Sequence, residues 1–313
     1  MSPSSSAQTD PHFERHGRIK CGTIIVPDIE VGISAYRDVL GMALVDRSPV
    51  SKCLCNLWGT PVMAGKPSAM LRHVSGAPCF LRLIENELPS DFVPTTTFGW
   101  AAFEHTSLGA FDWPKKLEGS AFEIVGPPRE IAGLAYFVPM QVFGPGQEMV
   151  YLNEVHQDTP TTDLPKANAD FDHMFIAVLA APDREAAVKW YANALQLDEG
   201  ETHVIEYTMI NRAFGQPKGT QSTLTMIQQD RMPIVEIDTY PAAATHRSHR
   251  AGTLPPGNAM VTLAVRDFAE LDVEWIAEPQ PIEGPLYDGR RTGTVVGPAG
   301  ELLELIELGN AAP

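Results

Sequence analysis

The side chains best suited to chemistry lie in the second half of the chain. His173 begins the apolar run His173-Met-Phe-Ile-Ala-Val, Glu236 and Asp238 alternate along one short apolar stretch, and Glu304 ends Gly297-Pro-Ala-Gly-Glu-Leu-Leu-Glu. Imidazole nitrogens and carboxylate oxygens can bind divalent metal ions, and the same groups can transfer protons. The residues alone leave structural roles open, because a single histidine on an apolar strand is more often a hydrogen-bonded core residue. Glu236 and Asp238 could likewise be the solvated edge of a strand.

A second source of ligands is the segment from Tyr240 to Gly257, which is rich in proline, alanine and glycine. It contains the H-x-x-H pair His246 and His249 within Thr245-His-Arg-Ser-His-Arg. Such a pair could donate a metal ligand, although a surface loop is the simpler interpretation. A loop of this kind could also close over a site as a lid.

An internal repeat organises the chain. The segment Gly144-Pro-Gly-Gln-Glu-Met-Val-Tyr-Leu returns 153 residues later, from Gly297 onward, and Val26 to Gly41 returns as Val178 to Leu197. Self-similarity at a fixed spacing indicates duplicated structural units. We therefore expect two domains, over residues 18–155 and 171–307. The polar, proline-bearing segment 156–170 would be the linker between them, and residues 1–17 would be a disordered leader.

Each half divides again into two units of one strand, one helix and three strands. Alternating and helical hydrophobic patterns predict these elements. The expected strands are 19–26, 54–58, 69–74, 80–85, 99–106, 122–125, 137–143, 149–155, 172–179, 204–213, 223–228, 234–238, 259–265 and 302–307, and the expected helices are 30–40, 109–118, 184–195 and 268–277.

Composition narrows the classes of partner. The chain has 313 residues, 44% of them hydrophobic, and a formal net charge of −16. Nucleic acids and anionic membranes require a basic surface, so neither is an expected partner. The sequence has no apolar run long enough to span a membrane and no signal peptide, which favours a cytoplasmic protein. The four cysteines, Cys21, Cys53, Cys55 and Cys79, form no C-x-x-C pair and are expected to be buried thiols.

Together, the four βαβββ units, the turn into a helix with a Y-x-x-x-L segment, and the closing G-P-x-G-E-L-x-E-L strand resemble the vicinal oxygen chelate superfamily. This superfamily includes glyoxalases, bleomycin-resistance proteins and extradiol dioxygenases, and the resemblance covers residues 18–307. It implies an α+β fold in which consecutive units pair into a curled eight-stranded mixed sheet with helices outside. It also implies a divalent metal ion on the concave face of that sheet, with ligands from the first and last strands.

Carried onto this chain, the resemblance assigns His173, Glu236 and Glu304 as metal ligands in the second domain, with Met260 at the fourth position. The corresponding first-domain residues are Cys21, Arg82, Trp100 and Tyr151. That half would be structural or would form a metal-free cavity, since Arg82 would repel a cation. The donors in the second domain suit manganese, magnesium, iron, zinc, cobalt or nickel, whereas the Met260 thioether is a soft ligand. The missing second histidine counts against ring-cleaving oxygenase activity.

Three functions remain open. The favoured one is a metal-dependent isomerase, epimerase or lyase acting on a small carbonyl or aromatic oxygenated substrate, with Glu236 or Glu304 as the catalytic group that moves a proton. The second is an extradiol-type dioxygenase that uses His246 or His249 as a ligand. The third is a metal-free binding protein. In each case the expected partner is a small molecule, with a homodimer as one option, and the residues expected to contact it are Met260, Phe175, Tyr207 and Met226.

Overall fold

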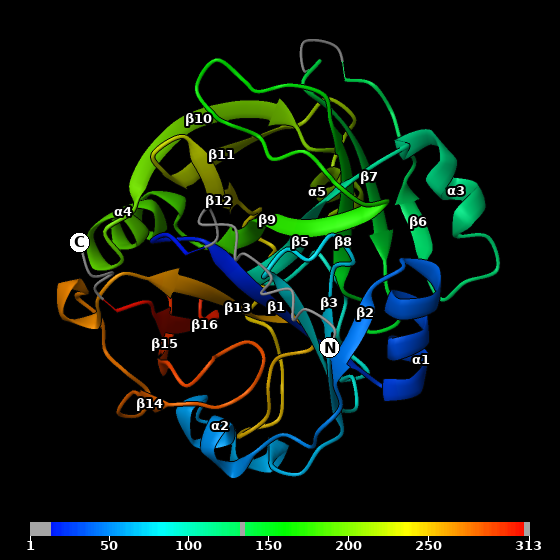
Figure 1. The fold of residues 1–313 in the computed structure, drawn as a ribbon. Coiled ribbons are helices and arrows are strands. Elements are labelled where there is room, and N and C mark those ends of the chain that lie inside the picture. The colour runs from blue at the N-terminus through cyan, green and yellow to red at the C-terminus, as the bar shows by residue number, and fades with distance from the viewer. Residues whose placement is uncertain (1–13, 132–134, 310–313) are drawn as a thin grey trace, which may run out of the picture.

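The computed structural model describes residues 14–131 and 135–309, which form two curled eight-stranded sheets with short helices around them (Figure 1). The α+β class and the eight-stranded mixed sheets predicted from the sequence are confirmed. Sheet I has the order β14 (Gln280–Pro281), β15 (Arg291–Val296), β16 (Leu302–Glu307), β13 (Gly257–Val265), β1 (Ile19–Val26), β4 (Phe80–Glu85), β3 (Ser68–Arg72) and β2 (Ala43–Asp46). Sheet II has the order β10 (Asp198–Glu206), β11 (Gln221–Gln229), β12 (Met232–Thr239), β9 (Phe171–Ala181), β5 (Gly99–Ser107), β8 (Met149–Val155), β7 (Phe137–Phe143) and β6 (Glu123–Gly126).

The pairing of the units differs from the expectation. Sheet I combines the first unit with the fourth through the antiparallel pair β1·β13, and sheet II combines the second with the third through β5·β9. The prediction that consecutive units share a sheet is therefore wrong, and neither 18–155 nor 171–307 contains a complete sheet. All four units begin with an equivalent buried strand. Hydrophobic alternation fixes which face of such a strand is buried but not which other strand it pairs with.

Helices begin where aspartates cap them. The Asp28 carboxylate accepts hydrogen bonds from the backbone N–H groups of Glu30 and Val31 at the start of α1 (Ile29–Ser34), which continues as a π-helical turn over Ala35–Val39. Asp183 caps α4 (Arg184–Ala194) in the same way. A side-chain acceptor at this position satisfies N–H groups that have no partner within the helix. These two equivalent caps fix the alignment of the repeats independently of the strands.

Several predicted elements are wrong in type. Residues 54–58 were expected to be a strand, but α2 (Lys52–Leu57) occupies this segment because the Ser51 hydroxyl accepts from Leu54 N–H and caps a helix. The expected strand at 204–213 is the end of β10 followed by α5 (Thr208–Ala213). By contrast, the expected short helical stretch at 109–118 is confirmed as a 3₁₀ turn at Ala110–Asp112 followed by α3 (Trp113–Lys116). The expected helix at 268–277 is only a 3₁₀ turn at Phe268–Glu270.

The largest core joins one face of each sheet to α1 and α4. It contains Ile24 and Leu83 from sheet I, Phe103 and Leu152 from sheet II, and the fully buried Tyr36. The sheets approach so closely that a Cβ on Gly22 of β1 would lie 2.8 Å from Cε2 of Phe103 on β5. The opposite, concave faces carry separate clusters. We call the concave face of sheet I the first cup and that of sheet II the second cup.

The chain segments outside the sheets differ from expectation in part. Of the predicted leader, residues 1–13 lie outside the described residues, but His16 is buried and its Nε2 lies 2.8 Å from Leu195 O.

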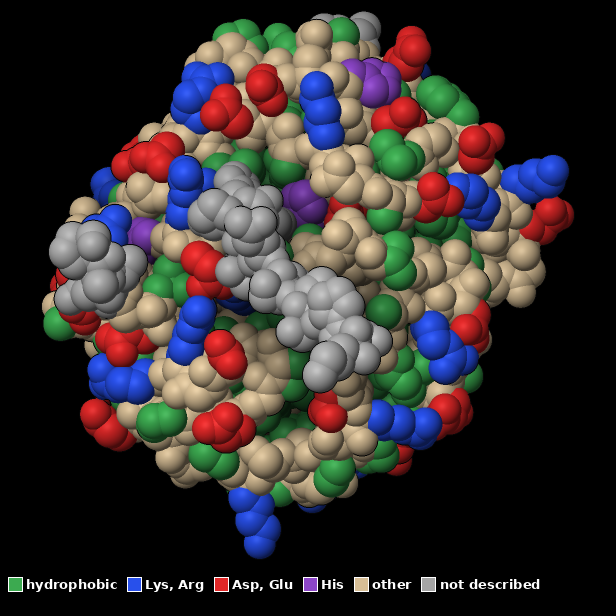
Figure 2. All heavy atoms as spheres, in the orientation of Figure 1, with side chains coloured by type: hydrophobic (Ala, Val, Ile, Leu, Met, Phe, Trp, Pro, Cys, Tyr) green, Lys and Arg blue, Asp and Glu red, His purple; other side chains and the backbone are tan. Residues whose placement is uncertain are grey.

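None of the described helices is both long and apolar enough to cross a membrane. Acidic and basic side chains are interspersed on the face shown in Figure 2, without a continuous basic surface on that face.

Candidate functional site

A buried ion pair lies in the first cup. Arg82 on β4 and Glu304 on β16 are 3% and 0% exposed, and Nη2 of Arg82 lies 3.1 Å from Oε2 of Glu304. Nε and Nη2 of Arg82 also donate to the Thr23 hydroxyl, at 3.0 and 2.9 Å. The guanidinium carbon lies 4.5 Å from the centroid of the Trp58 ring. The cation therefore has contacts with a carboxylate, a hydroxyl and an aromatic face.

Both oxygens of the Glu304 carboxylate accept hydrogen bonds. Besides Arg82, its carboxylate accepts hydrogen bonds from Trp58 Nε1 at 2.7 Å, Thr262 Oγ1 at 2.7 Å and the Tyr287 hydroxyl at 3.0 Å. Burial alone would lower the pKa of Arg82, but the adjacent Glu304 carboxylate raises it above the usual value. Arg82 therefore stays charged, and its pairing with Glu304 satisfies both groups.

The donors of the first cup do not fit a divalent metal ion. Because units one and four share the sheet, the positions that the superfamily resemblance assigns to ligands are Cys21, Arg82, Met260 and Glu304. Burial raises the pKa of the Cys21 thiol to about 12, so the thiolate is not available. The Arg82 guanidinium already neutralises Glu304. A metal ion would have to displace it and bind beside a second positive charge.

The second cup contains three carboxyl groups, of which Glu104 and Asp238 are buried and Glu236 is partly exposed. Glu236 and Asp238 alternate along β12 and so share one face, and Glu104 lies on β5. The Tyr207 hydroxyl donates to Glu236 Oε1 at 3.1 Å and lies 2.8 Å from the Tyr151 hydroxyl. Asn153 Nδ2 donates to Glu104 Oε2 at 2.7 Å.

Asp238 depends on Glu236 for a hydrogen bond. It is 1% exposed, and no donor among the described residues reaches either of its carboxylate oxygens. The Glu236 carboxyl projects from the same face of β12, and two neighbouring carboxyl groups can hydrogen-bond to each other only if one carries a proton. The two side chains are thus arranged as a carboxyl pair that shares a proton.

Burial raises the pKa of all three groups. It raises the pKa of Glu236 to about 7. The pKa of Asp238 and that of Glu104 are raised well above their usual values by burial and by repulsion from Glu236. Like charges this close in a low-dielectric site cannot all ionise. The cluster therefore holds exchangeable protons near neutral pH.

A small cavity adjoins this pair. Asp238 lines it together with Tyr151, Tyr207, Tyr240 and Ala102. In Figure 1, α5 lies between the β10–β12 and β6–β8 arms of the curled sheet. Its residues Met209 and Ile210 also line the cavity, so this helix covers the cup. The cavity walls are aromatic and apolar, with acidic and phenolic groups at one end.

The structure separates the predicted metal ligands. Glu304 lies in the first cup, Glu236 in the second, and His173 at the start of β9, where it lines a different cavity. Among the described ranges, no three His, Cys, Asp or Glu side chains are arranged to hold a metal ion. The expected convergence of His173, Glu236 and Glu304 is wrong for two reasons, the crossed pairing of units and an error of register in β9.

The register error is visible in the helix caps. Matching Asp28 with Asp183 makes Ile176, not His173, the equivalent of Cys21. The strand pairs agree, because Arg82 pairs with Thr23 in sheet I and Glu236 pairs with Val178 in sheet II. Met260 pairs with Thr23 and Ala102 pairs with Val178, so Ala102, not Trp100, is the equivalent of Met260. The resulting ligand positions in the second cup are Ile176, Glu236, Ala102 and Tyr151, which provide one carboxylate and no imidazole. This set does not fit the expected histidine and carboxylate site.

The residues expected to contact substrate also separate. Phe175, Tyr207 and Met226 belong to the apolar cluster of the second cup, whereas Met260 is buried in the first. Phe175 also lines the same cavity as His173. In the H-x-x-H loop, the His246 ring packs against Phe98, with centroids 5.6 Å apart, and His249 Nδ1 lies 3.1 Å from Arg247 O. Sequence reasoning missed Glu104 and treated Asp238 as a strand edge, although alternation with Glu236 was the available signal.

Comparison with solved structures identifies the fold. Glyoxalase I from Zea mays matches with a TM-score of 0.60 at 17% identity, covering 93% of this chain and 92% of that one. A Bacillus subtilis protein provisionally assigned as a dioxygenase matches with a TM-score of 0.59 at 12% identity, covering 94% of this chain and 86% of that one. This chain has the vicinal oxygen chelate fold. No family model and no curated protein sequence matches it.

Within the vicinal oxygen chelate fold, the two cups of this chain differ in the charged side chains that they contain. The first cup combines one cation with one carboxylate and is closed by hydrogen bonds. The second has an excess of carboxyl groups beside a cavity. Only the second combines titratable groups near neutral pH with space next to them, which makes it the candidate active site.

Proposed function

We propose that this protein is an enzyme that transfers a proton within a small oxygenated substrate bound in the second cup. The supporting observation is the Glu236–Asp238 carboxyl pair beside a cavity, with the pKa of Glu236 raised to about 7 by burial. A general acid or base works best when its pKa is near the working pH. Such a pair can carry out the proton transfers of isomerase, epimerase and lyase reactions that begin next to a carbonyl group.

The proposed step requires one proton on the pair. The ionised carboxylate accepts a proton from the carbon next to the substrate carbonyl, and the protonated carboxyl group donates its proton to the carbonyl oxygen. This produces an enol and leaves the pair with one proton, as before. Delivery of a proton to the opposite face of the same carbon inverts that centre, whereas delivery to the neighbouring carbon isomerises the substrate, and in both cases the enol O–H returns its proton to the pair.

Neighbouring residues have supporting roles. Asp238 faces the cavity, and Glu236 beside it is held by the Tyr207 hydroxyl. The aromatic and apolar walls exclude water, which strengthens the interaction between the carboxyl pair and a bound carbonyl oxygen. Neither cup offers the donors of a histidine and carboxylate metal site, so no step is assigned to a metal ion.

The test is exchange of substrate hydrogen with solvent. Wild-type protein is incubated in D₂O with a panel of 2-oxo acids and α-hydroxyketones, and NMR follows deuterium entering the carbon next to the carbonyl. We expect Glu236→Gln and Asp238→Asn to slow exchange by about 100-fold or more, the usual effect of losing an acid or base. Glu199→Gln, which removes an exposed carboxylate from the same sheet, is the control. If the wild-type protein exchanges substrate hydrogen no faster than the two pair variants do, the proposal is contradicted and a binding protein is favoured.

A further inference from the structure

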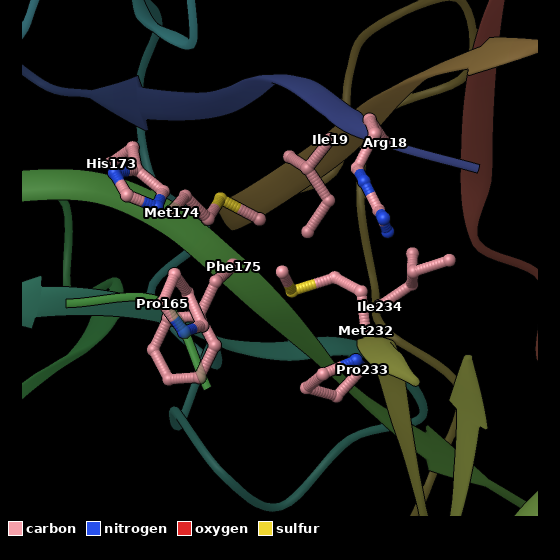
Figure 3. Close-up of a pocket in the computed structure, with 9 residues that line it drawn as sticks. All are labelled: Arg18, Ile19, Pro165, His173, Met174, Phe175, Met232, Pro233 and Ile234. Atoms are coloured by element: carbon pink, nitrogen blue, oxygen red, sulfur yellow. The ribbon is translucent and has the colours of Figure 1, made fainter. Parts of the chain in front are cut away.

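A second cavity lies where β1 of sheet I meets β9 and β12 of sheet II (Figure 3). Its walls are mainly apolar and include Phe175, Met232 and Ile234, with Arg18 and His173 as the polar members. In Figure 3 the guanidinium of Arg18 points toward Met232 and Ile234. No residue lines both this cavity and that of the second cup, so the two are separate sites.

Arg18 is a buried cation without an ion-pair partner among the described residues. It is 5% exposed, and no hydrogen-bond acceptor in the described part of the chain reaches its Nε or Nη1. Its backbone is fixed, because Ala264 N–H donates to Arg18 O at 2.8 Å. Burial lowers the pKa of Arg18 to about 10, which still leaves it charged at neutral pH.

Asp230 is the carboxylate whose charge acts on Arg18, but it is exposed and forms no ion pair with Arg18. Glu14 and Asp172, which neighbour lining residues in the sequence, are paired with other groups. Glu14 binds Lys20 at 2.8 Å and Arg290 at 2.6 Å. Asp172 accepts hydrogen bonds from Ser75 Oγ, Asn168 N–H and His173 N–H. A buried cation that no anion neutralises costs several kcal/mol of stability. An anion from outside the described residues would remove this cost.

The chemistry of the cavity indicates which anion. One guanidinium balances one negative charge, and the apolar wall favours a ligand with a hydrocarbon body. Phosphate would bring up to two charges and no apolar surface, so desolvating it here would be poorly compensated. We propose that this cavity binds small monocarboxylates, with the carboxylate on Arg18 and the hydrocarbon part against Phe175, Met232 and Ile234.

The experiment compares acids with their neutral amides. Isothermal titration calorimetry measures binding of benzoate and hexanoate to the full chain, with benzamide and hexanamide as uncharged analogues and inorganic phosphate at equal ionic strength. We expect each acid to bind at least ten times more tightly than its amide and more tightly than phosphate. Equal affinity for acid and amide, or stronger binding of phosphate, would overturn the proposal without the use of any variant.

Variants then locate the site. Arg18→Gln should weaken benzoate binding at least tenfold, while Arg15→Gln, an exposed arginine in the same segment, should leave it unchanged. Asp238→Asn in the second cup should also leave benzoate binding unchanged, which separates this site from the proposed active site. Circular dichroism verifies that each variant is folded. Undiminished benzoate binding by folded Arg18→Gln would show that Arg18 is not the anion site.

Discussion

The hydroxyl of Tyr36 donates a 2.6 Å hydrogen bond to Glu148, which lies 112 residues later in the chain. The bond joins the helix of the first unit, whose strands belong to sheet I, to the turn that precedes β8 in sheet II. Tyr191 and Glu301 repeat it at 2.7 Å between the third and fourth units. Each glutamate also accepts from a backbone N–H of its own turn, Gly146 or Ala299. The repeated G-P-x-G-E motif therefore fastens the two sheets together.

These glutamates make stability depend on pH. Burial raises the pKa of both Glu148 and Glu301 to about 7, so the folded state retains protons that the unfolded state releases near its ordinary value of 4.5. Their contribution to stability is complete below about pH 4.5, falls as pH rises, and is lost above about pH 7. Urea unfolding at pH 5, 6, 7 and 8 should show this fall.

Glu148→Gln separates this contribution from others. A glutamine amide copies the protonated acid, since its oxygen can accept from Gly146 N–H and its nitrogen can donate to the Tyr36 hydroxyl. Between pH 5 and 8 the variant should lose less stability than wild type, by an amount on the order of 1–3 kcal/mol. A variant curve parallel to that of wild type would mean that Glu148 does not titrate in this range.

Removing one partner of the Arg82–Glu304 pair should be more damaging than removing both. Arg82→Met leaves the fully buried Glu304 carboxylate without its cation, and this should cost about 3–5 kcal/mol in the free energy of unfolding. The double variant Arg82→Met/Glu304→Leu buries no charge and should recover part of that loss. Denaturant unfolding of Arg82→Met, Glu304→Leu and the double variant gives the free energies needed for a double-mutant cycle. If the losses of the two single variants sum to the loss of the double variant, the pair contributes no coupling.

Tyr207 should control the proton affinity of Glu236. Its hydroxyl stabilises the ionised carboxylate through a 3.1 Å hydrogen bond and so lowers the pKa of Glu236, which burial raises. Tyr207→Phe should therefore move the pKa of Glu236 further upward, and the rising limb of the pH–rate profile for solvent exchange should move with it. Carbon-13 NMR of labelled glutamate gives a reading that does not require turnover. Tyr136→Phe, at a partly buried tyrosine in the turn before β7, is the control. A pKa that moves downward in Tyr207→Phe refutes this role.

The sequence predicted the elements whose signals are local. The G-P-x-G-E turns before β8 and β16 and the aspartate caps of α1 and α4 were visible as motifs, because each depends on contacts within a few residues. Residues 54–58 were misjudged as a strand because a buried apolar run looks alike in either conformation. The serine cap at Ser51 was the deciding local feature.

The candidate site was less predictable because it depends on pairing between distant strands. Glu304 and Arg82 meet only because β16 and β4 lie in one sheet, and a duplication cannot reveal which units combine. A shift of three residues in β9 was enough to replace Ile176 by His173 in the predicted ligand set. Glu236 was placed in the correct strand, but a role for its neighbour Asp238 follows only once Asp238 is known to be buried.

The crossed pairing makes the architecture nested, with one pair of units enclosed by the other along the chain. Sheet II uses only residues 99–239 and can be completed while the rest of the chain is still being synthesised. Strand β1 must wait for β13, which is more than 200 residues away in sequence, as Thr23 opposite Met260 illustrates. Until then its hydrogen-bonding edge is open to other strands. Cleavage at 156–170 would therefore yield two half-chains with complementary edges, which could restore the sheets only by joining each other.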